Sequence, residues 1–100
     1  IAYTAVYTGS ATAYTAPASS FTATGRPAQY GNVAVNPDLI PYGSRLYICS
    51  PDGSYVYGYA VAADTGGALM SGSALVDVYF DTLSECYGFG RRTLSVYILA

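Results

Sequence analysis

The stretch VAADTGGALMSGSALVDVYFD, residues 61–81, joins two strand-like segments through a glycine-rich turn. β-Branched and aromatic residues on both sides of the turn favour β-strands. Asp64 ends the first apolar run, directly before Thr65 and Gly66, and Asp77 lies between two valines in the second. A carboxyl group at the end of an apolar strand, half removed from water, can hold a proton near neutral pH. The two aspartates are therefore the first candidates for acid chemistry.

Outward from this stretch, the chain is predicted to form short strands separated by turns. The tetrapeptide PDGS (51–54) is a tight-turn signal, so residues 45–50 and 55–63 are expected to form a hairpin. The other expected elements are strands at 10–16, 33–37, 74–80 and 92–99, a polar loop at 16–32 and a short helix at 81–90. The pattern predicts a small, mainly β barrel of about six strands with one short helix. Residues 10–100 are expected to form the domain, after a linker or N-terminal strand at 1–9.

Composition narrows the class of protein. One hundred residues make one small domain, and only ten of them are charged. A net charge of −2 with four arginines gives no basic stripe, so a nucleic-acid partner is not expected. A surface rich in hydroxyl groups is typical of extracellular proteins that handle carbohydrate. No apolar run approaches the roughly 20 residues of a membrane-spanning helix, so membrane insertion is not expected. The first residues, IAYTAVYTG, lack the basic start of a signal peptide, which indicates a mature fragment or an excised domain.

The two cysteines, Cys49 and Cys86, leave two possibilities open. In an exported domain they favour a disulfide, and otherwise they are buried free thiols that act as small apolar side chains. The chain has no histidine, which excludes the usual zinc-ligand sets. We therefore expect no metal and no cofactor.

The remaining acids have structural explanations. Asp38 and Asp52 lie in turns, Asp81 stands at the start of the predicted helix, and Glu85 is expected to face solvent on that helix. Structural alternatives also exist for the two candidates. Asp64 could accept hydrogen bonds from the backbone of its own glycine turn, and Asp77 could simply face solvent.

Two kinds of enzyme use a pair of carboxyl groups for acid–base catalysis. The tripeptide Asp-Thr-Gly at 64–66 is shared with dimeric aspartic proteases, whereas glycoside-cleaving enzymes need an acid that protonates the leaving oxygen. In the short-chain proteases the tripeptide lies near the start, but here about two-thirds of the chain precedes it. No flap hairpin fits between Asp64 and Gly90 beside the strand and helix predicted there. The protease interpretation is therefore disfavoured.

Four segments occur in an order that is more specific than the tripeptide alone. They are TAY (12–14), VAVNPDLIPYGSRLYI (33–48), YAVAADTGGALMSGSALVDVYF (59–80) and GFGRRTLSVYIL (88–99). Over roughly residues 10–99 the chain resembles the three-aspartate (3D) domain. That domain occurs in bacterial stationary-phase survival proteins and in A-type membrane-bound lytic transglycosylases.

The resemblance implies a double-psi β-barrel with a groove that binds the glycan strands of peptidoglycan. The implied activity is lytic cleavage of the β-1,4 bond between N-acetylmuramic acid and N-acetylglucosamine, which leaves a 1,6-anhydro end. A single carboxyl group can protonate the leaving oxygen and then accept the proton of the attacking 6-hydroxyl. We expect Asp64 in this role and Asp77 as its electrostatic partner. The domain is expected to be a monomer, secreted or associated with the bacterial cell wall; a non-catalytic glycan-binding module is the alternative.

The resemblance also suggests the secondary residues of the site. Substrate contacts are expected from Asn36, Thr65, Gly66 and Tyr14, the last because aromatic faces stack on sugars. The remaining family aspartate stands directly before a proline, and here that position is Asn36, which can bond a sugar but cannot ionise. On the helix after the last aspartate, Cys86 replaces the family's alanine, which suggests a disulfide to Cys49.

Overall fold

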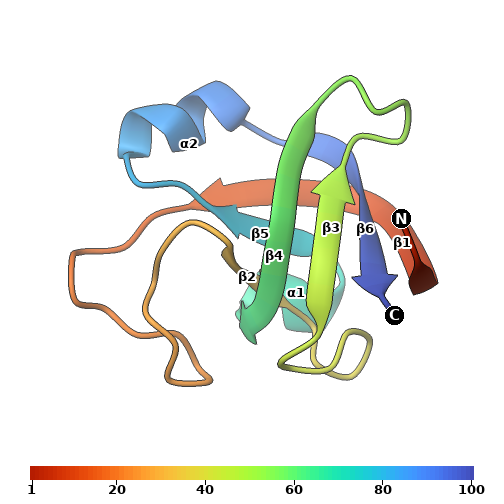
Figure 1. Cartoon of the computed structure of the whole chain (residues 1–100). Helices are drawn as coiled ribbons and strands as arrows, with labels where there is room; N and C mark the ends of the chain where they lie inside the picture. The colour runs from red at the N-terminus through yellow and green to blue at the C-terminus, as the bar shows by residue number, and fades with distance from the viewer.

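The chain folds into a closed barrel of six strands, shown in Figure 1, and the computed structural model describes residues 1–100. The elements are β1 (Tyr3–Tyr14), β2 (Asn32–Val35), β3 (Arg45–Cys49), β4 (Val56–Asp64), α1 (Gly67–Ser71), β5 (Val76–Tyr79), α2 (Leu83–Phe89) and β6 (Arg92–Leu99). Around the barrel the strands follow the order β1, β5, β2, β4, β3, β6. The prediction of a mainly β, six-stranded barrel is confirmed.

Strand β1 closes the barrel because it pairs with two neighbours along its length. Residues from Tyr3 to Ala11 run antiparallel to β6, and residues from Ala11 to Tyr14 run parallel to β5. The expected strand at 10–16 is thus the end of a longer strand that includes most of residues 1–9. The second parallel pair is β2 with β4, and all other pairs are antiparallel. In Figure 1, β3 and β4 lie side by side and cross in front of β1 and β5.

The hairpin predicted around the PDGS turn is confirmed as β3 and β4. Its turn is held by the carboxylate of Asp52, which accepts hydrogen bonds from the backbone of Ser54 and from the hydroxyls of Ser54 and Ser50. These bonds lower the pKa of Asp52 to about 2, with the backbone bond from Ser54 as the largest cause. The structural explanation given for this acid is therefore correct.

Alternate residues of the strands point into the barrel and fill it with apolar side chains. The main core consists of Ala11, Val33, Val35, Ile40, Leu46, Ile48, Tyr57, Ala60, Ala62, Val76, Val78, Phe89, Leu94 and Val96. Because these positions face inward, the residues between them on each strand face outward. Thr12, Ala34 and Asp77 belong to this outward set, and so do not pack in the main core.

Tyr30 and Tyr57 hold the long loop, residues 15–31, against one end of the barrel. The ring of Tyr30 stacks on the buried Tyr57 with centroids 4.3 Å apart, and its hydroxyl donates to the Tyr57 carbonyl. The Tyr57 hydroxyl accepts from the Gly31 N–H at 2.9 Å and donates to the Tyr79 carbonyl at 2.8 Å. One side chain of β4 therefore connects the start of β2 to the end of β5.

The predicted helix is present as α2, and a second short helix, α1, was not predicted. Thr82 caps α2 by accepting from the Glu85 N–H, and its hydroxyl donates to the Glu85 carboxylate. The turn after Asp64 continues into α1, which ends at Gly72 with φ of 84°, a conformation that favours glycine. Neither helix has the length and hydropathy that crossing a membrane requires.

The disulfide that the resemblance suggested is not formed, because Cys49 and Cys86 are both free and buried. Cys49 ends β3 in register with Ser95 of β6, which pairs with Thr8 of β1. Cys86 lies on α2, against the end of β1 beyond Thr12. Thr8 and Thr12 alone are about 13 Å apart along the strand, whereas bridged cysteines need Cα atoms within about 7 Å.

Candidate active site

Asp64 and Asp77 come together because the same residue of β2 pairs with both. Ala34 lies opposite Asp77 of β5 in the antiparallel pair and opposite Asp64 of β4 in the parallel pair, where a register shift after Val33–Ala62 breaks the alternation of β4. Residues opposite each other in a sheet direct their side chains to the same face. The two aspartates therefore share the outer face of the barrel, about 10 Å apart at Cα, with only the methyl group of Ala34 between them.

Apolar side chains partly shield this pair of acids from water. Leu69 of α1 and Ala74, just after α1, pack on Ala34, and Tyr14 of β1 packs against the same small cluster. The glycine turn that follows Asp64 thus returns α1 over the outer face of β2. This placement explains why the site lies on the outside of the barrel and yet is only half exposed.

The environment of Asp77 favours the protonated form of its carboxyl group. Burial raises the pKa of Asp77, a hydrogen bond from the Thr12 hydroxyl at 2.9 Å opposes the shift, and the negative charge of Asp64 adds to it. Thr12 is the residue of β1 that pairs with Asp77, so the bond follows directly from the strand register. Asp77 is half-buried rather than solvent-exposed.

Asp64 is held by two backbone donors. Its Oδ1 accepts from the Thr65 N–H at 2.9 Å and from the Ala23 N–H at 3.0 Å. The expected alternative, bonds from Gly66 or Gly67, is not what the structure shows. The second donor comes from the long loop, which also bonds β4 through Thr24 N–H and the Ala63 carbonyl.

Tyr14 lies close to both acids. Burial raises the pKa of its phenol, and the charges of Asp64 and Asp77 raise it further. Its hydroxyl stays protonated and donates to the Asn32 carbonyl at 3.3 Å, while its ring meets Tyr79 edge-on at 5.3 Å. The structure therefore places Tyr14, predicted as a substrate contact, at the edge of the acid pair.

The other predicted contacts lie at different distances from the acids. Thr65 follows Asp64 directly, and its hydroxyl is buried without a hydrogen-bond partner. Gly66 caps α1 through its carbonyl, which accepts from the Leu69 and Met70 N–H groups. Asn36 lies two residues beyond Ala34, about 7 Å further along the strand direction. Its side chain accepts from the Asp38 N–H and closes its own turn.

Two hollows flank the acid pair along β1. The first, of about 500 Å³, lies between the end of β1 and α2, where Thr12 and Tyr14 face Tyr87. The second, of about 260 Å³, lies beyond Asp77 and is lined by Ser10, Asn36 and residues around α1. Tyr87, which is 77% exposed, was not expected in the site, and no local sequence pattern distinguishes it from the other tyrosines.

Comparison with known proteins identifies the family. A sequence profile described as the 3D domain matches residues 31–100. The chain belongs to the 3D domain family. It is 40% identical over 101 residues to YabE of Bacillus subtilis (strain 168), which is provisionally described as a cell wall shaping protein. It is 39% identical over 99 residues to YocH of the same organism, a cell wall-binding protein.

The alignments cover nearly all of this 3D domain but a small part of its relatives. They include 94% and 92% of the chain, and 23% of YabE and 32% of YocH. The family predicted from the four segments is confirmed. The matched profile begins at residue 31, so it leaves out β1, which supplies Thr12 and Tyr14 to the acid site.

The raised pKa of Asp77 predicts a gain in stability when this residue is replaced in the 3D domain. The native state binds the Asp77 proton more tightly than the unfolded chain, so ionisation of Asp77 destabilises the fold as pH rises above the ordinary aspartate pKa. Asp77→Asn should therefore raise Tm at pH 7, and the gain should vanish near pH 3. Thermal denaturation at several pH values measures it. The matched control is Asp81→Asn, at an exposed site, and an equal gain there would contradict the explanation.

Proposed function

We propose that this 3D domain binds peptidoglycan glycan strands and cleaves them as a lytic transglycosylase. The observation that supports the proposal is a pair of carboxyl groups on one face, of which Asp77 has a raised pKa. Burial raises the pKa of Asp77, and the carboxylate of Asp64 is held in place by two backbone N–H groups. Glycosidic cleavage needs an acid with a raised pKa that protonates the leaving oxygen, and a nearby group that stabilises positive charge on the ring.

The roles that follow reverse those expected from the resemblance. Asp77 protonates the glycosidic oxygen, and the bond to C1 of the muramic acid breaks with positive charge on the ring. Asp64 stabilises that charge without forming a bond. The Asp77 carboxylate then accepts the proton of the 6-hydroxyl as its oxygen attacks C1, so the acid is restored and the 1,6-anhydro ring closes. No water molecule is consumed.

The flanking hollows suit a polymeric substrate. A glycan strand that crosses the acid pair would place one sugar against Tyr14 and Tyr87, and another against Ser10 and Asn36. Thr65, directly after Asp64, is a further proposed substrate contact. Since both acids come from one chain, the site needs no second copy to complete it, which further disfavours a dimeric aspartic protease.

The second candidate function is a non-catalytic glycan-binding module. Asn36 at the position of the third family aspartate favours it, as does the description of YocH as a cell wall-binding protein. In either case we propose that the domain acts at the bacterial cell wall, outside the cytoplasm.

Mass spectrometry of digested peptidoglycan distinguishes the two functions. After incubation with purified peptidoglycan, the domain is expected to release muropeptides with 1,6-anhydro ends, which are lighter by one water than hydrolysed ends. A known lytic transglycosylase serves as the positive control. Binding to the polymer without anhydro products, under conditions where the control yields them, would exclude the enzyme and favour the binding module.

A further inference from the structure

Four tyrosines form a row across the outer face of the barrel, away from the acid pair. Tyr47 of β3 is in register with Tyr59 of β4 on one side and with Tyr97 of β6 on the other. The rings of Tyr47 and Tyr59 meet edge-on at 5.1 Å, and Tyr97 meets Tyr3 of β1 edge-on at 4.9 Å. The tyrosine row, residues Tyr3, Tyr47, Tyr59 and Tyr97, thus spans four neighbouring strands.

The rings at the two ends of the row are open to solvent. Tyr59 is 69% exposed and Tyr3 is 49% exposed. Elsewhere in the barrel, the hydroxyls of Tyr14, Tyr30 and Tyr57 each donate to a backbone carbonyl, whereas no such bond engages the hydroxyls of the row. The row is exposed at its two ends and half-buried at Tyr47 and Tyr97, and its hydroxyls are free to bond a ligand.

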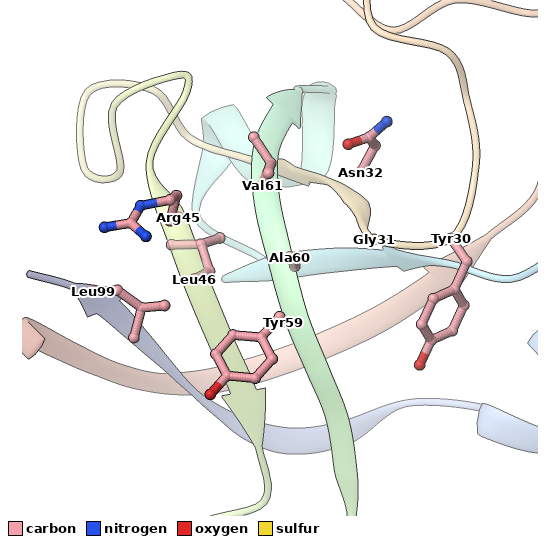
Figure 2. Close-up of a pocket in the computed structure, with 9 residues that line it drawn as sticks. All are labelled: Tyr30, Gly31, Asn32, Arg45, Leu46, Tyr59, Ala60, Val61 and Leu99. Carbon is pink, nitrogen blue, oxygen red and sulfur yellow. The ribbon is translucent and has the colours of Figure 1, made fainter. Parts of the chain in front are cut away.

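A hollow of about 360 Å³ adjoins the end of the row at Tyr59. Figure 2 shows Arg45, Leu99 and the Tyr59 ring on one side of β4, with Tyr30 on the other. Arg45 donates to the Ala100 carbonyl at 2.9 Å, which keeps its side chain extended over this edge. The other charged residues of the four strands are Asp64, at the end of β4, and Arg92, at the start of β6, so Arg45 is the one charge near the row.

We propose that the tyrosine row is a second binding surface for a glycan strand, separate from the acid site. Tyrosine ring faces can stack on the C–H faces of sugars, and free hydroxyls can bond sugar hydroxyls. The near absence of charge argues against nucleic acid and against a strongly charged protein partner. The row and the acid site share strand β4, which carries Tyr59 and ends at Asp64. In naming peptidoglycan as the polymer, this inference rests on the proposed function.

A binding assay with a cleavage-deficient background isolates the contribution of the row. The Asp77→Asn chain is mixed with insoluble peptidoglycan, and the bound fraction is measured by sedimentation. Adding Tyr3→Ala and Tyr59→Ala is expected to lower the affinity about tenfold, from the loss of two stacking contacts. Tyr59→Phe keeps the ring and should stay within about twofold. The matched control is Tyr42→Ala, at an exposed tyrosine in the turn before β3, which should bind like the background.

The outcomes separate this surface from the transglycosylase proposal. Unchanged affinity in the double variant would overturn the proposal that the tyrosine row binds glycan, whether or not the unmodified chain releases anhydro ends. A tenfold loss of affinity would support the proposed binding surface. A failure to find anhydro ends would overturn only the proposed transglycosylase activity. Sedimentation velocity of the chain alone provides a further test. A dimer that Tyr59→Ala abolishes would overturn the inference, since the row would then be a contact between copies.

Discussion

Replacing Asp77 with asparagine is expected to lower the rate of glycan cleavage at least a hundredfold, because general acid catalysis contributes about 10²- to 10⁴-fold. Asparagine can still accept the hydrogen bond from Thr12, so the barrel and the neighbouring hollows should be preserved. The rate of release of anhydro ends measures the loss. Sedimentation with insoluble peptidoglycan, expected to be unchanged, shows that the substrate is still bound.

Comparison with Asp64→Asn assigns the two roles. Asp64 is expected to stabilise charge without transferring a proton, so its replacement should leave measurable activity. Asp81→Asn, at an exposed position, should behave as the unmodified chain. If Asp64→Asn abolished cleavage and Asp77→Asn retained it, the roles first expected from the resemblance would be correct and those proposed from the structure would be wrong.

Tyr57→Phe is expected to lower the free energy of unfolding by about 2 kcal/mol. The hydroxyl that it removes serves two backbone groups, the Gly31 N–H and the Tyr79 carbonyl, and both would be left without a partner. For a domain of this size, the loss corresponds to a decrease in Tm of about 10 °C. Thermal denaturation followed by circular dichroism measures it.

Tyr59→Phe is the matched control for Tyr57→Phe. The two tyrosines lie two residues apart on β4, but Tyr57 is 4% exposed and Tyr59 is 69% exposed. The same chemical change at Tyr59 should shift Tm by about 2 °C at most, because it leaves no buried group unpaired. Equal shifts at both positions would show that the Tyr57 hydroxyl does not connect β2, β4 and β5 as described.

The strands and the hairpin could be predicted because their signals are local. The PDGS turn, the alternation of apolar residues and the β-branched runs each lie within a few residues of the element that they specify. Helix α1 could not be predicted in this way, because its five residues, which begin at the second glycine of the pair, carry too little helical pattern. Its formation depends on packing of Leu69 against Ala34, a residue far away in the sequence.

The two aspartates could be found from the sequence, but their environments could not. The bond that Asp77 accepts comes from Thr12, 65 residues earlier, and one of the bonds to Asp64 comes from Ala23, 41 residues earlier. Both depend on how β1 and the long loop close around the barrel. The disulfide suggested between Cys49 and Cys86 was wrong because the sequence does not show how far apart the barrel places the two residues.

The double pairing of β1 determines where the smallest independent folding unit begins. A protein trimmed to residues 31–100 would lack β1 and would leave β5 and β6 as open edges. Unpaired edges recruit strands from other molecules, so such a fragment would favour aggregation over a soluble barrel. Fragments of longer proteins that carry this domain should therefore be cut upstream of Tyr3.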